Sequence, residues 1–378
     1  MNTLSASGRL HGLDTLRACA ISLVLMSHYA VVVSHQSTFG FLTDMGWMGV
    51  DLFFVLSGYL IGNQVISALV NGEGFSLTTF FARRLLRTLP NYYVVLALYF
   101  LLPENLAGSA TASIWRFLSF TQNMGLHFGE TFSHSWSLCV EEQFYLLLPL
   151  LAVLIVSAKK PLTLAWVTLF AAIGVGMAVR GYAWWAHGQQ AMTDIDYAVR
   201  VYYASAARFD ELLPGVAIAL LQNCHQKRFA QILRRGNLLL TLGIVSSCLM
   251  MYLMKTYFDN DSGFNGYLMT FGFSLLAWSF AILTMAALSP TSLLHRCRVP
   301  GAERLALWSY AIYLAHKPIF KLLLAPMAHF NIDINAPLGI SLIMVLAIAG
   351  GWLLFRVVET PFMTLRSTYF PSTKTYLG

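Results

Sequence analysis

Long apolar stretches, each about as long as a membrane is thick, are the feature that most constrains how this chain can fold. A helix of roughly 17–25 mostly apolar residues crosses a bilayer core, and only 11% of the 378 residues are charged. The sequence predicts ten such stretches: residues 13–34, 48–70, 89–102, 138–157, 162–186, 200–221, 238–255, 267–288, 305–325 and 337–357. The expected fold is therefore an all-α, polytopic integral membrane protein.

Two segments leave the number of spans open. The third stretch is short for a full crossing, and residues 114–128 could form a re-entrant or interfacial segment. Nine and eleven spans are the alternatives to ten. We expect residues 1–366 to form a single transmembrane domain, followed by a short cytoplasmic tail over residues 367–378.

The distribution of Lys and Arg predicts which helix ends face the cytoplasm, because the cytoplasmic loops of membrane proteins are enriched in both. With the N-terminus inside, the loops on the opposite side contain only Arg116 and Lys255. The cytoplasmic helix ends then hold 17 of the 24 basic residues: Arg9, Arg17, Arg83, Arg84, Arg87, Lys159, Lys160, Lys227, Arg228, Arg234, Arg235, Arg296, Arg298, Arg304, Arg356, Arg366 and Lys374. This asymmetry predicts ten spans with both the N- and the C-terminus in the cytoplasm.

Charge distribution, cysteine spacing and missing motifs argue against several kinds of function. The net charge of +7 is spread over short loops, without a basic stripe interleaved with aromatic residues, so we expect no nucleic-acid partner. The five cysteines form no CxxC pair, which argues against a disulfide framework and against a zinc site. No HExxH or GxSxG pattern occurs either, so neither a zinc protease nor an α/β-hydrolase is indicated. We expect no metal site.

Arg17 and His28 are set into the otherwise apolar first span. Eleven residues of helix place them within about 20° of the same face and about 16 Å apart along the axis. Asp14, three residues before Arg17, can interact with it on the helix surface. Arg17 alone could simply extend to lipid headgroups, but a histidine at membrane depth usually faces a cavity or a pathway. Because imidazole titrates near neutrality, His28 is the candidate general base.

Two later segments add charged groups at the start of a helix. The run FFARRLLRTLP (80–90) contains Arg83, Arg84 and Arg87, which either anchor the protein at the membrane surface or bind phosphate groups through their forked donors. The run HSWSLCVEEQFYLLLP (134–149) contains Glu141 and Glu142. Neighbouring helix positions diverge by about 100°, so one carboxylate is expected to face the bundle and the other solvent or an arginine.

Two segments place charged or titratable groups inside later spans. ARFDELLPG (207–215) contains Arg208, Asp210 and Glu211, and charges at membrane depth must pair or face water. Arg208 and Glu211 are spaced i, i+3, which fits a structural clamp as well as a binding role. SYAIYLAHKPIF (309–320) places His316 within the ninth span.

Taken together, these segments resemble the acyltransferase-3 family of polytopic membrane acyltransferases. Arg17 and His28 match the family's pattern of a basic residue, ten intervening residues and a histidine. GVDLFFVLSGYLIG (49–62) resembles its second-span signature, RRLLR (83–87) its arginine motif, and HSWSLCVEEQFYLLLP its SWSL-x-VE-x-QFY segment. ARFDELLPG, SYAIYLAHKPIF and VVETPF (357–362) correspond more loosely to later landmarks, so the resemblance covers nearly the whole chain.

The resemblance implies an enzyme that moves an acyl group, often acetyl from acetyl-CoA, across the bacterial cytoplasmic membrane onto extracytoplasmic glycans. Some members carry an additional SGNH-type domain, which we do not expect here. Acyl-CoA would be the donor substrate, with no tightly bound cofactor, and a glycan or lipid-linked saccharide such as lipopolysaccharide or another cell-envelope polysaccharide would be the acceptor. Membrane lipids are the other expected partners.

The catalytic hypothesis combines this resemblance with the residues. The phosphates of acyl-CoA would bind Arg83, Arg84, Arg87 and Arg17. His28 would act as general base on a sugar hydroxyl, and Glu141 would orient its imidazole or stabilise its charged form. The supporting or structural candidates are Asp14, Glu142, Tyr145, Arg208, Asp210, Glu211 and His316. Direct transfer and a covalent acyl-enzyme both remain open, with Ser27, Ser57 and Tyr145 as candidate nucleophiles.

A transporter of a glycolipid or small anion is the main alternative, because polar side chains at membrane depth also suit a transport pathway. Against it, the sequence shows no pair of Gly/Pro-broken helices in matching halves. A non-catalytic membrane sensor is a third alternative. Release of free CoA thiol in the presence of an acceptor would distinguish the enzyme from both.

Overall fold

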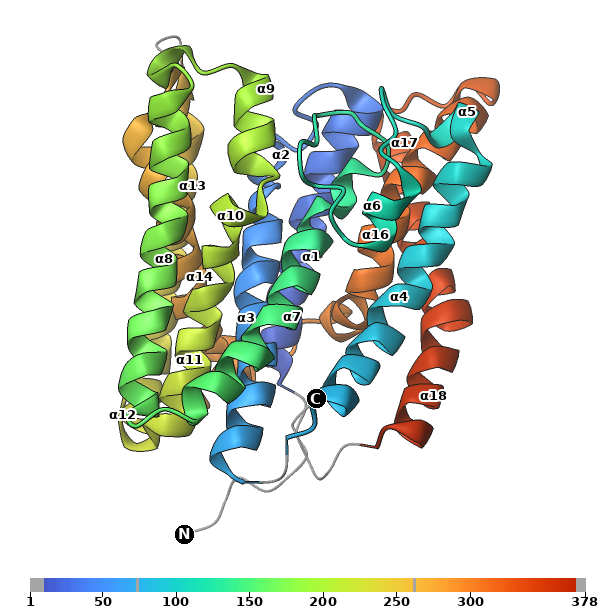
Figure 1. The fold of residues 1–378 in the computed structure, drawn as a ribbon. Helices are drawn as coiled ribbons and strands as arrows, with labels where there is room; N and C mark the ends of the chain where they lie inside the picture. The colour runs from blue at the N-terminus through green and yellow to red at the C-terminus, as the bar shows by residue number, and fades with distance from the viewer. Residues whose placement is uncertain (1–9, 73–74, 261–262, 372–378) are drawn as a thin grey trace.

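The computed structural model describes residues 10–72, 75–260 and 263–371, and these form a bundle of long helices (Figure 1). Its described part contains one small sheet, the antiparallel pair β1 (Asp259–Asn260) and β2 (Gly263–Phe264). Apart from this two-residue pairing, the regular structure of the described residues is helical, which confirms the prediction of an all-α protein. The structure covers all the predicted site residues, whereas Arg9 and residues 372–378, including Lys374, lie outside the described residues.

Seven helical segments are long and apolar enough to cross a membrane, which confirms the expectation of an integral membrane protein. They are α1 (His11–Tyr29) continued by the π-helical η1 (Ala30–Ser34), α3 (Met48–Val70), the 3-10 turn η2 (Ser133–Ser135) with α7 (Trp136–Val156), α8 (Pro161–Ala186), α13 (Gly236–Tyr257), η6 (Leu268–Gly272) with α14 (Phe273–Leu288), and α17 (Pro337–Leu354) continued by η7 (Phe355–Glu359) and α18 (Thr360–Tyr369).

The other three predicted spans are also helical but more polar or interrupted. They correspond to α4 (Leu77–Leu101), to α16 (Ala302–His329), and to the run α10 (Ser205–Arg208), η5 (Phe209–Leu212) and α11 (Leu213–Cys224). Helix α4 begins twelve residues before the predicted third span at residue 89, because its first turns carry arginines that face an internal cavity. The count of ten spans stays a prediction.

The predicted sixth span, residues 200–221, is not one continuous helix. A π-helical turn, η4 (Ala198–Tyr202), ends before α10, and 3-10 turn η5 separates α10 from α11. Backbone carbonyls released by such a break must find donors inside a membrane protein. Here Arg180 donates to the carbonyl of Ala207, and Arg208 donates to that of Tyr202. Buried guanidinium groups therefore stabilise the interruption.

Short elements connect the long helices at the two ends of the bundle. The upper end in Figure 1 carries α2 (Phe41–Met45), α5 (Pro103–Leu106), α6 (Ile114–Leu118) and α9 (Asp194–Tyr197), and η3 (Gln189–Ala191) precedes α9. The lower end carries α12 (Gln226–Leu233), the start of α4 and the end of α18, and α15 (Leu293–Arg296) connects α14 to α16. Only residues 114–118 of the predicted interfacial segment 114–128 are helical.

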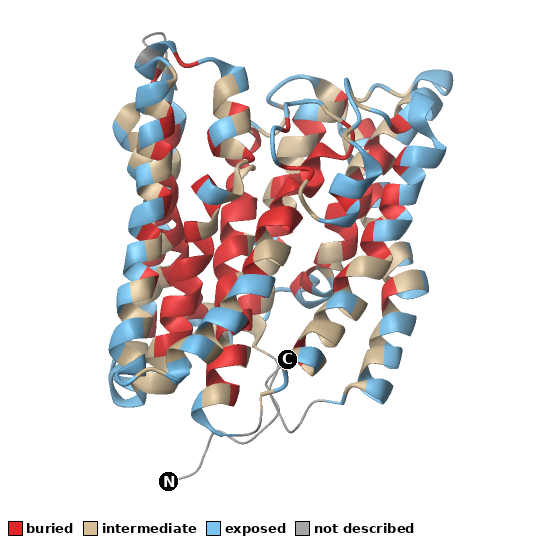
Figure 2. Cartoon of the chain, viewed as in Figure 1, coloured by how far each residue is buried: buried red, intermediate tan, exposed pale blue. Residues whose placement is uncertain are grey.

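Buried residues concentrate on the central helices, and exposed residues lie mainly on the peripheral ones (Figure 2). Many of the exposed residues are large and apolar. Helices α3 and α11 approach closely because Gly58 faces the backbone of Leu212 and Gly215 faces that of Val55. A Cβ at either glycine would overlap the opposite backbone. Small residues at a contact of this kind allow helices to pack closely in membranes.

Candidate active site

Among the cavities formed by the described residues, two lie within the bundle and are lined by different side chains. The arginine cavity, about 710 Å3 in volume, has Arg17, Arg83, Arg84, Arg87, Glu141 and Tyr145 among its lining residues. The histidine cavity, about 840 Å3 in volume, has Ser27, His28, Asp44, Tyr99, His134, Trp136 and Lys317 among its lining residues. The structure thus brings together the four arginines that the sequence predicted to act as one group.

Helix α1 contributes to both cavities. Arg17 lines the arginine cavity and His28 lines the histidine cavity. This placement confirms the prediction that both side chains face the interior from a single helix. Asp14, the predicted partner of Arg17, interacts with it electrostatically.

His28 of α1 forms a hydrogen bond with His316 of the neighbouring helix α16. The His28 Nδ1 and His316 Nε2 atoms are 2.7 Å apart, and the two rings stack at 4.9 Å between centroids. His316 Nδ1 lies 3.0 Å from the carbonyl oxygen of Ile312, which can only accept, so this nitrogen carries the proton. In the neutral pair His316 Nε2 then accepts from His28 Nδ1, and the Nε2 atom of His28 keeps its lone pair.

His134 is a third imidazole beside this pair, and the sequence analysis assigned it no role. Its ring centroid is 5.2 Å from that of His316 and 6.2 Å from that of His28. The Nε2 atom donates to the carbonyl of Leu314 over 3.2 Å. Pro318 lacks the amide hydrogen that would otherwise bond this carbonyl within α16. The Nδ1 atom of His134 is buried and, among the residues that the structure describes, has no hydrogen-bond partner.

The two cavities are separated by a layer of hydrogen-bonded side chains. The Tyr313 hydroxyl donates to the backbone carbonyl of His134 over 2.6 Å and accepts from the Ser137 hydroxyl over 2.6 Å. Tyr313 and Ser137 line the arginine cavity, whereas His134 lines the histidine cavity. The Tyr313 ring is 6.0 Å from that of His316 between centroids. Roughly one side chain therefore lies between the cavities at this point.

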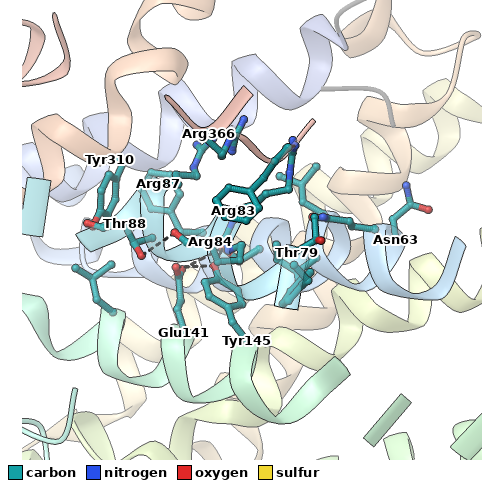
Figure 3. Close-up of a pocket in the computed structure, with 18 of the residues that line it drawn as sticks. Asn63, Thr79, Arg83, Arg84, Arg87, Thr88, Glu141, Tyr145, Tyr310 and Arg366 are labelled. Atoms are coloured by element: carbon teal, nitrogen blue, oxygen red, sulfur yellow. Dashed lines mark hydrogen bonds between the residues drawn. The ribbon is translucent and has the colours of Figure 1, made fainter. Parts of the chain in front are cut away.

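Glu141 faces the arginine cavity and does not contact His28. Its carboxylate accepts from Ser57 over 3.1 Å and from the Tyr145 hydroxyl over 2.8 Å (Figure 3). The prediction that Glu141 orients the His28 imidazole is wrong in this geometry, because His316 occupies that position. The Arg84 guanidinium lies over the Tyr145 ring at 4.1 Å.

Glu142 shares the Arg84 guanidinium with Glu141 but forms a different hydrogen bond. It interacts with Arg84 electrostatically and with Thr88 through a side-chain hydrogen bond. Both residues that it meets belong to α4. The two adjacent carboxylates thus diverge in their hydrogen bonds, as expected, but both lie near Arg84, whereas the sequence predicted that only one would meet solvent or an arginine.

The charges of ARFDELLPG form buried ion pairs. Arg208 binds Glu211 at 2.5 Å and Asp51 of α3 at 2.9 Å, and all three side chains are fully buried. Asp210 instead binds Arg180 of α8 at 2.7 Å. The predicted i, i+3 partnership of Arg208 and Glu211 is confirmed, while Asp51 and Arg180 were missed because they are distant in sequence. These contacts join α3, α8 and η5.

A further ion pair lines the histidine cavity, and its carboxylate member, Asp44, lies outside the membrane-spanning segments. The Asp44 carboxylate of α2 accepts hydrogen bonds from Lys255 and from Ser37. The bond from Lys255, and secondarily that from Ser37, lowers the pKa of the Asp44 carboxyl below its usual value. Asp44 is therefore ionised near neutrality, and the pair connects α2 to the end of α13.

The free nitrogen atoms of the histidine cluster determine which chemistry it can support. In the described part of the chain, no group of three His, Cys, Asp or Glu side chains has the geometry to hold a metal ion. Two imidazole nitrogens, His28 Nε2 and His134 Nδ1, are left as hydrogen-bond acceptors. The cluster can accept a proton from a group that enters the cavity.

The sequence profile of the acyltransferase-3 family, described as an acyltransferase domain, matches residues 10–356. The chain belongs to the acyltransferase-3 family. The resemblance read from the motifs is thereby confirmed, and the helices of this family member contain the two cavities described above. Residues 357–371, which include α18, follow the matched region.

Curated relatives of this acyltransferase-3 protein include O-acetyltransferases. The chain is 30% identical to the peptidoglycan O-acetyltransferase OatA of Listeria monocytogenes over 92% of its own length and 55% of that protein. It is 27% identical to the O-acetyltransferase OatA of Staphylococcus aureus over 93% of its own length and 57% of that protein. The chain thus spans little more than half the length of these relatives. No solved structure matches it.

Proposed function

We propose that this acyltransferase-3 protein is a membrane O-acetyltransferase that transfers an acetyl group from acetyl-CoA to a glycan hydroxyl, with His28 as general base. The observation that carries the proposal is the hydrogen-bonded row from His28 through His316 to the Ile312 carbonyl. This row leaves one bare imidazole nitrogen of His28 at a cavity large enough for a sugar. A base positioned in this way typically accelerates a reaction about 10²- to 10⁴-fold.

The arginine cavity supports the choice of donor. Acyl-CoA carries several phosphate charges at one end and an uncharged pantetheine thioester at the other. Guanidinium groups bind phosphates through paired hydrogen bonds, and Arg17, Arg83, Arg84 and Arg87 all line this cavity. The uncharged arm would extend toward Tyr313, which lines the arginine cavity and donates a hydrogen bond to the backbone of His134 in the histidine cavity.

The chemical step proposed is direct transfer. His28 Nε2 takes the proton from a sugar hydroxyl while the hydroxyl oxygen attacks the thioester carbonyl. The C–S bond then breaks, the acetyl group stays on the sugar oxygen, and the proton passes to the leaving thiolate to give free CoA. His134 would position the acceptor by accepting a hydrogen bond at its Nδ1 atom. Tyr145 and Ser57 lie beside Glu141 and away from His28, which favours direct transfer over an acyl-enzyme on either residue.

The relatives support the choice of acceptor and cellular location. A peptidoglycan O-acetyltransferase is among them, so we propose a cell-wall glycan or its lipid-linked precursor as acceptor and the bacterial cytoplasmic membrane as location. Aromatic side chains suit the apolar faces of sugar rings, and Phe128, Trp136, Tyr202 and Tyr203 line the histidine cavity. Donor entry from the cytoplasm would place this cavity on the opposite side.

Purified protein in proteoliposomes tests the proposal. With acetyl-CoA and muropeptide acceptors, the unaltered chain should release free CoA thiol and add one acetyl mass to the acceptor. His28→Ala should lower the rate at least about 100-fold. His329→Ala is the matched control, since His329 is exposed at the end of α16, away from the cluster.

Two outcomes would contradict the proposal. A His28→Ala variant that acetylates at the unaltered rate would remove His28 as the base. Passage of labelled glycolipid across the membrane without consumption of acetyl-CoA would favour the transporter instead.

A further inference from the structure

Helix α18, which follows the region matched by the family profile, forms one wall of the arginine cavity. It lies against α4 in the opposite direction, as two contacts show. Glu359, just before α18, accepts a hydrogen bond from Asn91 over 2.8 Å. Near the other end, the Arg83 guanidinium donates to the carbonyl of Phe370. The last turn of α18 is therefore beside the first turns of α4.

Arg366 extends from α18 into this cavity, where Arg83, Arg84 and Arg87 also converge (Figure 3). All three lie close enough to Arg366 to repel it electrostatically. Among the described residues, the Nε atoms of Arg84 and Arg366 are buried without a hydrogen-bond partner. Buried donors of this kind cost free energy unless a ligand or water satisfies them.

The positive charge of the cavity is not balanced by its own carboxylates. Five arginines and one glutamate, Glu141, line it. Glu141 already accepts bonds from Ser57 and Tyr145, and the nearby Glu359 accepts from Asn91. Several guanidinium groups gathered on one side of a cavity favour a ligand with more than one phosphate.

The cavity also has an inner and an outer end. Tyr313 and Ser137, beside the histidine cluster, line the inner end. Phe75 and Ser76, at the start of α4, and Pro371, after α18, line the outer end. Arg83 and Arg366 belong to the outer end, because the contact of Arg83 with Phe370 is made there. A ligand that spans the cavity would thus carry its phosphates outside and its uncharged end inside.

We propose that α18 completes the donor site and that Arg366, together with Arg83, binds phosphate groups at the nucleotide end of acyl-CoA. This inference rests on the proposed function and extends it to a residue that the sequence analysis counted only as a membrane-surface charge. Arg366 acts as a binding residue far from the reacting atoms. Its loss weakens donor binding and leaves the chemical step intact.

A calorimetric titration of the purified full chain with CoA, which measures the Kd for CoA, tests the assignment. Arg366→Ala should raise the Kd for CoA about 10- to 100-fold, the effect expected for a lost charged hydrogen bond. Arg366→Lys should recover part of the affinity, since it keeps the charge but loses the forked geometry. Arg356→Ala is the matched control, because Arg356 is exposed ten residues earlier on the same helical segment.

Kinetics separate a binding role from a general loss of folding. Arg366→Ala should raise the KM for acetyl-CoA by a similar factor and leave kcat within about twofold of the unaltered enzyme. A thermal unfolding midpoint equal to that of Arg356→Ala would show that the helix is intact. If Arg366→Ala does not fold, Arg366→Lys carries the same comparison.

The outcomes distinguish the two proposals. If the unaltered chain binds CoA and Arg366→Ala binds it equally well, the role of α18 is overturned and the proposed function stands. If the unaltered chain binds no CoA, the donor assignment fails together with the role of Arg366. An Arg366→Ala variant with lower kcat and unchanged Kd would also overturn the assignment.

Discussion

In the proposed reaction, the basicity of His28 depends on a neutral partner and not on a carboxylate. His316 accepts from His28 Nδ1, and the Ile312 carbonyl fixes which nitrogen of His316 carries the proton. An imidazole pair of this kind carries no charge before the reaction. That suits a membrane interior, where an uncompensated ion is costly. His316 is therefore a positioning residue for His28.

Substitutions at His316 should show this positioning role. His316→Leu removes the acceptor, so His28 loses the bond that directs its Nε2 atom to the cavity. We expect kcat to fall about 10- to 100-fold with the KM for acetyl-CoA unchanged. His316→Gln keeps an acceptor oxygen and should restore part of the rate. Equal rates for the Leu and Gln variants would show that His316 is needed only for packing.

The site residues that could be predicted from the sequence are those identified by a pattern within one short segment. Arg17 and His28 were found because one helix carries both, and Arg83, Arg84 and Arg87 because they are adjacent. His134 was overlooked although it lies within a recognised motif, since its significance depends on a bare nitrogen next to His316. The partner of His28 is 288 residues away in the chain, and no spacing rule connects such positions.

At the level of helices, Pro318 connects the backbone of α16 to the histidine cluster. A proline inside a helix leaves the carbonyl four residues earlier without its usual donor. Here that carbonyl belongs to Leu314, and His134 donates to it. Pro318 thus leaves the Leu314 carbonyl oxygen free to accept a hydrogen bond from His134, which belongs to a different helical segment. The same helix contains a second proline, Pro326, eight residues further along.

Replacing Pro318 should therefore affect activity more than stability. Pro318→Ala supplies an amide hydrogen that competes with His134 for the Leu314 carbonyl. We expect kcat to fall about 2- to 10-fold, the effect of about one ordinary hydrogen bond, with no loss in the thermal unfolding midpoint. Pro326→Ala is the matched control and should keep full activity. An equal loss in both variants would point to a change in helix shape instead.

The predicted helix boundaries were wrong in two segments whose polar residues face the interior of the bundle. Hydropathy alone placed the third span at residues 89–102, but α4 begins at Leu77, and its arginine-bearing turns are helical too. It also joined residues 200–221 into one span, whereas η5 interrupts it around Arg208 and Asp210. Both errors have one cause. Apolar runs record contact with lipid, and these segments instead face cavities or buried ion pairs.

At the scale of the whole molecule, the same helices line two chemically different cavities. Helix α1 contributes Arg17 to one and His28 to the other, and α16 contributes Tyr310 to the first and Lys317 to the second. A donor could enter from one end and an acceptor from the other, so that the acetyl group alone passes between the cavities. This arrangement requires the arginine cavity to open toward the cytoplasm, as the basic residues predict.

Cysteine labelling in intact cells tests this orientation. Cys297 is exposed shortly before α16, the helix that begins at the arginine-cavity end. In a variant with the other four cysteines replaced, a membrane-impermeant maleimide should label Cys297 only after the membrane is permeabilised. Ala110→Cys, an exposed position between α5 and α6 at the opposite end, should be labelled without permeabilisation in a chain lacking the native cysteines.

The reverse pattern would place the arginine cavity outside the cell, where no acetyl-CoA is available, and the donor assignment would fail. Labelling of both positions from the same side would contradict an arrangement in which the two cavities open at opposite faces.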